Sequence, residues 1–435
     1  MNHKSYLALA LPLTLSTVTT PLLGAVDTAV VGQLDNPAYI GGVAIGTVIF
    51  NTMYWLFGFL RISTSGFAAQ AFGARDELQE RLSFIRPFFI ALLIGLVFLL
   101  LQNPIEYAAL KLLNPESDVE ALASSYFAIR IWGVPVTFVN YVILGWLMGM
   151  SRIKIAVMIQ VLMNLVNIFL DLLFVQGFSW GVPGVAAATL IAESLALVIG
   201  IYVIAKSTSI TFKSLSMAHI LDTSALKKML LVNQDLFVRT VCLLLVFNIF
   251  TYKSASFGTE TLAANAVLIQ IHYLMAYFFD GFSNASSILS GKAVGSQDYP
   301  LHRKTLSISA QWAVYTSIFL TVLYGLFHER IIQLFTNNQE VIAIAMTYSN
   351  WLLLFPISTS IGIIFYGIFT GATETAPVRK SMIFAFLFFL IVYFVSVPLL
   401  DNHGLWLAFI AFSAGRSIFL SFYVPKLKTS FAGLN

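Results

Sequence analysis

The sequence predicts an all-α polytopic membrane protein, and two features of its composition carry this prediction. Hydrophobic residues make up 58% of the 435 residues and charged residues only 10%, with a mean hydropathy of +0.85. Soluble domains are nearer to a quarter charged. Open sheets cannot cross a bilayer because their edges leave backbone groups without hydrogen bonds, so the apolar segments are expected to be helices.

Twelve apolar segments, separated by charged or turn-rich breaks, predict twelve transmembrane helices. They cover residues 5–32, 39–72, 87–110, 119–150, 155–177, 183–205, 229–256, 261–294, 305–327, 339–371, 381–400 and 405–424. Several are longer than the roughly 20 residues that a bilayer needs, which predicts tilt, kinks or extension beyond the membrane. The first segment has no clear cleavage site and is expected to be a retained helix rather than a signal peptide.

The basic residues orient the predicted spans. Sixteen Lys and Arg residues fall in or beside the breaks on one side of the membrane and three on the other, which places both termini in the cytoplasm. These residues lie in short separate loops, so no nucleic-acid partner is expected. The single Cys242 lies in an apolar run and predicts no disulfide framework.

The chain repeats itself across a central polar segment, residues 206–228. FGARDELQERLSF (72–84) parallels VGSQDYPLHRKTL (294–306), and GWLMGM (145–150) parallels GIFTGA (367–372), an offset of 367 − 145 = 222 residues. Since each half has six spans, the two halves have the same orientation and are related by pseudo-two-fold symmetry about an axis along the membrane normal. Such parallel repeats are typical of transporters.

This symmetry predicts the division of the chain into three parts. They are an N-terminal lobe over residues 1–210, a cytoplasmic linker over 211–228 and a C-terminal lobe over 229–435.

Two acids within the predicted spans are the first candidates for function, because ionisable groups at membrane depth are costly and rare. Asp27 lies about five residues from the outer end of the first span, and Asp171 about six from the outer end of the fifth. Thr189 falls at a similar depth in the sixth span. The corresponding stretch of the second half, residues 386–400, contains no acid. An asymmetric polar cluster in a symmetric scaffold favours a functional site over packing.

Two amides extend this cluster. Asn164, Asn167 and Asp171 are spaced i, i+3 and i+7 and therefore share one face of the fifth span. Hydrogen bonding between helices remains an alternative role for Asn164 and Thr189. Glu193 lies one helical turn after Thr189 and either extends a proton path inward or forms a structural pair.

Other residues are predicted at the bends, the gate and the walls of a transport path. Pro12 and Pro21 each remove a backbone hydrogen bond from the first helix, which permits either a switchable bend or a static kink. Arg61 and Asp280 lie in the inner halves of repeat-equivalent spans and are a candidate cytoplasmic gate. Asp235 and Arg239, at i and i+4, are expected to form a local ion pair. The aromatic residues expected to line a cargo cavity are Phe50, Tyr54 and Tyr277.

The sequence resembles a known family. LPLTLSTVTTPLLGAVDTAVVGQL (11–34), NLVNIFLD (164–171), GVPGVAAATLIAE (181–193) and the twelve-span repeat resemble the multidrug and toxic compound extrusion (MATE) transporters. TSGFAAQAFGARD and YFFDGF suggest its bacterial DinF-like branch. The resemblance covers essentially the whole chain.

The resemblance implies two six-helix lobes around a V-shaped cavity and efflux driven by a proton or sodium gradient. It assigns the coupling ion to Asp27, Asn167, Asp171 and Thr189, and the bend of the first helix to Pro12. One departure concerns the fourth helix, where Leu144 stands at a position that is often asparagine, with Asn140 one turn earlier. The resemblance further implies cationic or amphipathic cargo, a monomer in the inner membrane, and no cofactor.

The expected mechanism couples one proton-binding group to the shape of one helix. Asp27 and Asp171 are expected to titrate as a coupled pair. Protonation of Asp27 from outside weakens its attraction for a cationic substrate, the first helix bends at Pro12 or Pro21, and the cargo leaves. The same oxygen ligands suit Na⁺, so both coupling ions remain open.

Two other functions remain as alternatives, and a third is not expected. A lipid-linked precursor flippase of the same superfamily would favour a more cationic cavity, and a passive channel would carry cargo without an ion gradient. No HExxH, GxSxG or Walker-type motif occurs, so an enzyme is not expected.

Overall fold

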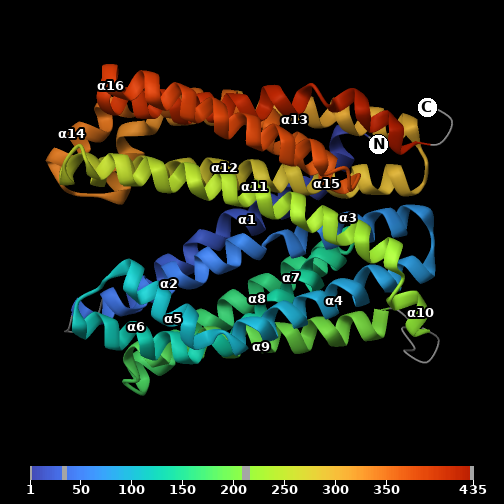
Figure 1. Ribbon diagram of the computed structural model, residues 1–435, viewed down its shortest axis with the longest axis horizontal. Helices are drawn as coiled ribbons and strands as arrows, with labels where there is room; N and C mark the ends of the chain where they lie inside the picture. Colours follow the sequence, from blue (N-terminus) through green and yellow to red (C-terminus); the bar gives the residue numbers. More distant parts are fainter. Residues whose placement is uncertain (1, 32–36, 208–215, 432–435) are drawn as a thin grey trace. The chain divides into compact units, whose positions relative to one another are not determined.

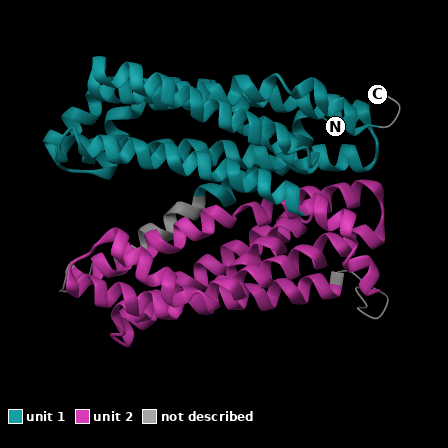
Figure 2. Cartoon of the chain, in the orientation of Figure 1, with its two compact units in different colours: residues 1–18, 230–435 teal, residues 19–229 magenta. Residues whose placement is uncertain are grey.

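The computed structural model describes residues 2–31, 37–207 and 216–431, without the side chains of residues 19–29, 31, 37 and 207. This part of the chain is helical, and it divides into two compact units (Figures 1 and 2). Unit 1 contains residues 1–18 and 230–435, and unit 2 contains residues 19–229. The first helix, α1 (His3–Val31), contributes its first turns to unit 1 and the rest to unit 2.

Unit 2 is a helical bundle around the pairs α3–α7, α4–α7 and α8–α9. Besides the second part of α1, its elements are α2 (Pro37–Phe57), α3 (Phe59–Ala74), α4 (Glu77–Leu100), α5 (Gln102–Leu113), α6 (Ser117–Arg130), the 3₁₀ turn η1 (Ile131–Gly133), α7 (Val134–Gly149), α8 (Ile153–Asp171), the π-helical segment η2 (Leu172–Gly177), α9 (Gly181–Ser207) and α10 (Met217–Ile220). The short α10 is held to α4, because the Arg86 guanidinium donates to the carbonyl oxygens of His219 and Ile220.

Unit 1 is a second bundle, in which α12 and α15 form the most extensive helix pair. Its elements after α1 are α11 (Thr223–Ala255), α12 (Thr259–Gly295), α13 (Tyr299–Phe335), α14 (Gln339–Tyr348), α15 (Trp351–Gly371), α16 (Ala376–Ser421) and the 3₁₀ segment η4 (Val424–Ser430). α11 begins in unit 2 and enters unit 1 at residue 230.

The internal repeat is visible in the turns that join the helices. Asp76 caps α4 by accepting from the Gln79 amide, and Asp298 caps α13 by accepting from the Leu301 amide, an offset of 298 − 76 = 222. Each cap follows a residue in the left-handed region, Arg75 with φ 54° and Gln297 with φ 55°. The matching FGARD and VGSQD sequences therefore make the same turn, as the sequence predicts.

The repeat is equally clear where helices touch. A Cβ atom on Gly145 of α7 would meet the Arg61 carbonyl oxygen of α3 at 2.3 Å. A Cβ atom on Gly367 of α15 would meet the Ser283 carbonyl oxygen of α12 at 2.0 Å, and 283 − 61 is again 222. Glycine is required at both positions because the facing backbone occupies the space of a side chain.

Ten helices in the described ranges are long and apolar enough to cross a membrane, judged by length and composition. Predicted span 381–400 and most of predicted span 405–424 lie within the single helix α16, which is interrupted at Asp401 (φ 48°, ψ −123°), between the two predicted segments. Other predicted spans are built from two helices, since α2 ends and α3 begins around Gly58. The break between the predicted spans 39–72 and 87–110 is shorter than expected, because Asp76 caps α4 and the helix begins at Glu77, ahead of the apolar run.

Candidate functional site

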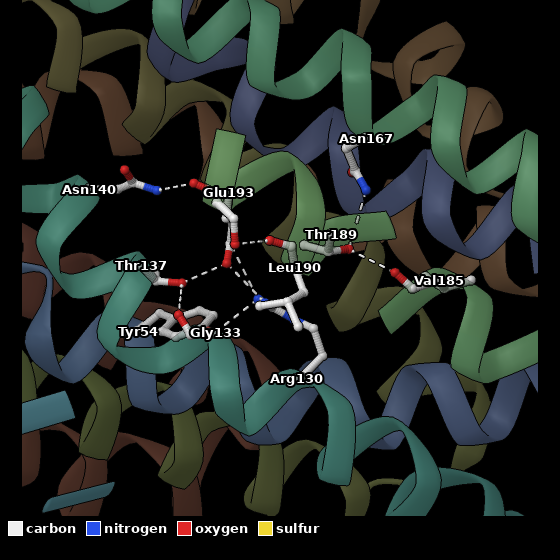
Figure 3. A network of polar contacts seen from close by, with 11 residues as sticks. Tyr54, Arg130, Gly133, Thr137, Asn140, Asn167, Val185, Thr189, Leu190 and Glu193 are labelled. Atoms are coloured by element: carbon white, nitrogen blue, oxygen red, sulfur yellow. Dashed lines mark hydrogen bonds and ion pairs between the residues drawn. The ribbon is translucent and has the colours of Figure 1, made fainter. Parts of the chain in front are cut away.

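The predicted polar cluster of the fifth and sixth spans lies on α8 and α9 of unit 2. Asn167 Nδ2 donates to Thr189 Oγ1 at 3.3 Å, and Thr189 Oγ1 in turn donates to the Val185 carbonyl oxygen at 3.1 Å (Figure 3). Asn167 is 1% exposed, and Asp171, one turn further along α8, is 0% exposed. α8 ends at Asp171, where the backbone continues as the π-helical η2. Asn164 shares this helix and is half-buried.

A buried ion pair lies one turn further along α9. Arg130 Nη1 donates to Glu193 Oε2 at 2.9 Å, and Arg130 Nη2 donates to Glu193 Oε1 at 3.2 Å (Figure 3). Thr137 Oγ1 donates to Glu193 Oε2 at 2.8 Å. The arginine is 3% exposed. This two-point contact is a charge-assisted pair between guanidinium and carboxylate, so Glu193 has the partner that one of its two predicted roles requires.

Aromatic rings surround the arginine side of this pair. The Arg130 Cζ atom lies 5.4 Å from the centroid of the Phe50 ring and 5.6 Å from that of Tyr54, within cation–π range. Arg130 Nη2 also donates to the Tyr54 hydroxyl at 2.9 Å. Phe50 and Tyr54, predicted as cavity walls, are buried against Arg130 within unit 2. Their role towards cargo stays a prediction.

The local sequence makes room for the ion pair. A Cβ atom on Gly133, at the break between α6 and α7, would meet Arg130 Nη1 at 2.7 Å. Asn140 of α7 donates to the backbone carbonyl of Glu193 at 2.9 Å and so ties α7 to α9 at the level of the pair (Figure 3). The asparagine that the sequence offers one turn before Leu144 therefore contacts the backbone next to the ion pair.

The start of α1 is fastened to α12 within unit 1. The Tyr6 hydroxyl lies 2.8 Å from Ser286 Oγ, and Thr17 Oγ1 donates to the Tyr277 carbonyl oxygen at 2.8 Å. Pro12 lies between these two hydrogen-bonding residues. The side chains of Asp27 and Pro21 lie outside the described residues, although both belong to α1.

The two predicted gate residues belong to different units. Arg61 is a half-buried residue of α3 in unit 2, and Asp280 is a half-buried residue of α12 in unit 1. Asp280 interacts electrostatically with Arg416 of α16. Direct pairing of Arg61 and Asp280 stays a prediction.

The prediction of an ion pair between Asp235 and Arg239 is wrong. Asp235 Oδ1 lies 2.6 Å from Arg379 Nη1, and Asp235 Oδ2 accepts from Thr375 Oγ1 at 2.8 Å. Arg239 instead lies over the Tyr366 ring, 4.0 Å from its centroid. The two partners of Asp235, Thr375 and Arg379, lie around the start of α16, 140 residues or more away in sequence. Spacing along one helix could therefore not reveal them.

Arg130 is the residue that the sequence reasoning missed. It lies within the predicted fourth span, and an arginine at that depth is a functional or structural signal by itself. Within the described ranges, no group of three or more His, Cys, Asp or Glu residues is placed to hold a metal ion.

The MatE family model matches residues 12–173 and 236–395, one segment in each half of the chain. DNA damage-inducible protein F of Escherichia coli K12 is 34% identical over 423 residues, covering 97% of this chain and 91% of that protein. A probable multidrug resistance protein NorM of Bacillus subtilis is 21% identical, covering 99% and 96%.

Solved structures share the fold. A MATE crystal structure in the bent conformation has a TM-score of 0.90 at 19% identity, covering 98% of this chain and 96% of that chain. An outward-facing MATE family transporter of the MOP superfamily has a TM-score of 0.88 at 18% identity, covering 98% and 97%.

Proposed function

Because this chain belongs to the MATE family of multi-pass membrane transporters, we propose that it is a secondary active antiporter. In this proposal it exports cationic or amphipathic compounds from the cell in exchange for inward H⁺ or Na⁺. Members of this family are transporters and not enzymes. The names of distant relatives as multidrug resistance proteins support the proposed cargo class.

One observation carries the proposed coupling site, namely the buried polar group on α8 and α9. Asn167 and Thr189 are joined by a hydrogen bond, and Asp171 is fully buried one turn away. By the 222-residue offset, the residues equivalent to Asn167 and Asp171 are Phe389 (167 + 222) and Tyr393 (171 + 222). Unit 1 thus has aromatic residues where unit 2 has an amide and an acid, which a purely structural role does not require.

The coupling ion is proposed to bind between this group and Asp27 of α1. Binding of a proton or Na⁺ cancels carboxylate charge and lowers the attraction for a cationic cargo. The hydrogen bonds of Tyr6 and Thr17 fix the first turns of α1 to α12. A bend at Pro12 therefore requires one of these bonds to break, whereas a bend at Pro21 does not.

The proposed membrane arrangement follows from the same elements. Ten candidate spans, the division of α16 at Asp401 and the addition of α1 give twelve. An even number places both termini on one side, which the basic loops assign to the cytoplasm of a bacterial inner membrane. Two six-helix lobes around a V-shaped cavity, and a monomeric state, stay predictions.

Gradient-driven transport in proteoliposomes tests this function. The protein is reconstituted, a fluorescent cationic dye is supplied, and either a pH or a Na⁺ gradient is imposed. Dye movement that depends on one gradient supports antiport and identifies the ion. Dye movement that is equal with and without either gradient contradicts it.

A further inference from the structure

Unit 1 carries a second charged cluster, at positions unrelated by the repeat to the cluster of unit 2. Arg239 of α11 lies with its Cζ atom 4.0 Å from the centroid of the Tyr366 ring of α15. Arg416 of α16 lies with its Cζ atom 5.7 Å from the centroid of the Phe412 ring. Arg239 and Asp280 both lie within electrostatic reach of Arg416. Four helices of one unit therefore contribute to this cluster.

The cluster has more positive than negative charge. Asp235, one turn before Arg239, is paired with Arg379, and among the described residues Asp280 is the carboxylate that acts electrostatically on Arg416. Within the described part of the chain, neither Arg239 nor Arg416 forms an ion pair. Adjacent like charges at membrane depth are costly unless a counter-ion is present.

The geometry leaves the arginines able to bind such a counter-ion. Both side chains are half-buried rather than sealed in the core. A guanidinium stacked on an aromatic ring still presents its N–H groups in the plane of the fork, where carboxylate, sulfonate and phosphate oxygens bind. By the 222-residue offset, the residues equivalent to Arg239 and Arg416 are Thr17 (239 − 222) and Ser194 (416 − 222). The paired positive charge therefore belongs to unit 1 alone.

We propose that Arg239 and Arg416 form a binding site for an oxyanion head group attached to an apolar body. The nearby rings of Tyr366 and Phe412 suit the apolar part, and Asp280 competes with the ligand for Arg416. This inference rests on the proposed function and deepens it, because it assigns an anionic head group to the amphipathic class of cargo. A carboxylated or sulfonated compound and an anionic lipid head group share this chemistry.

Binding of two dansyl probes to purified protein tests the site without any gradient. Dansylglycine carries a carboxylate, and dansylcadaverine carries an ammonium on the same fluorophore. Arg239→Gln and Arg416→Gln are expected to weaken dansylglycine binding by about tenfold or more, the size of a lost charge-assisted contact, while dansylcadaverine binding is kept. Arg330→Gln, at an exposed arginine of the same unit, is the matched control and is expected to bind both probes normally.

Asp280→Asn separates binding from a structural role. It removes the competing carboxylate and is expected to tighten dansylglycine binding several-fold, with thermal unfolding recorded for every variant. Failure of wild-type protein to bind dansylglycine, or equal binding by the arginine variants, overturns the proposal. The proposal is also overturned if Asp280→Asn weakens dansylglycine binding as much as the arginine variants do.

Two further arms complete the test. Displacement of dansylglycine by phosphatidylglycerol but not by phosphatidylcholine identifies a lipid head group as the source of the anion; no displacement identifies free cargo. If dansylglycine binding does not depend on Arg239 and Arg416 while gradient-driven dye export is intact, only this inference is refuted. Arg-dependent binding without gradient-driven export refutes the proposed function and leaves the anion site standing.

Discussion

Glu193 of α9 and Arg130 of α6 form a buried two-point ion pair, 63 residues apart in sequence and one helical turn from the Asn167–Thr189 hydrogen bond. Thr137 adds a third donor to the carboxylate, and Tyr54 accepts from the guanidinium. The pair therefore holds α6, α7 and α9 together directly beside the proposed coupling site. Its loss is expected to affect stability first and transport second.

Removing one member of this pair is expected to destabilise the protein. Arg130→Gln leaves a buried carboxylate without its counter-charge, which costs about 3–5 kcal/mol in comparable buried pairs. We expect a clear fall in the thermal unfolding temperature for Arg130→Gln and for Glu193→Gln, and a smaller fall in the double variant than the sum of the two. Additive effects in this double-mutant cycle, measured by intrinsic fluorescence in detergent, would show that the two groups act independently.

The contact of α1 with α12 gives a second prediction. A Cβ atom on Gly281 would meet Thr14 Oγ1 at 2.1 Å and Thr14 Cα at 2.3 Å. Gly281→Ala must therefore push α1 away from α12, and we expect a loss of about 1–3 kcal/mol of stability. Gly325→Ala is the matched control, since its Cβ atom would meet only Leu353 Cδ2 at 3.4 Å. Equal unfolding temperatures for both variants would contradict this packing.

The hydroxyl of Thr189 gives a third prediction. Thr189→Val keeps the shape of the side chain but removes the group that accepts from Asn167, so we expect gradient-driven transport to fall by about tenfold, the cost of about one hydrogen bond. Thr189→Ser keeps the hydroxyl and is expected to retain most of the activity. Thr347→Val, at an exposed threonine of α14, serves as the control. Full transport by Thr189→Val would remove this residue from the site.

The sequence predicts the parts of this molecule that depend on local or periodic signals. Hydropathy predicts the spans, and the 222-residue offset predicts that Asp76 and Asp298 begin equivalent helices. Spacing on one helix predicts that Asn167 and Asp171 share a face. These features need no knowledge of which helices are neighbours.

The remaining features depend on neighbours that the sequence does not name. Arg130 and Glu193 form an ion pair because α6 packs against α9. Asp235 pairs with Arg379 rather than with Arg239 because α11 lies beside the start of α16. The grouping of residues 1–18 with unit 1, rather than with residues 19–210, follows from close packing of α1 at Gly281. The predicted N-terminal lobe over residues 1–210 stays a prediction, because hydropathy does not tell which bundle a helix joins.

Transport by Asp27→Asn in proteoliposomes tests the coupling proposal most directly. The variant keeps the size of the side chain and removes its ability to bind a proton or contribute a charge to Na⁺ binding. Asp118→Asn, at an exposed acid of α6, is the control. We expect Asp118→Asn to export a fluorescent cation under an inward pH or Na⁺ gradient as wild type does, and Asp27→Asn to lose this gradient-driven export. Export by Asp27→Asn at the wild-type rate would contradict the account.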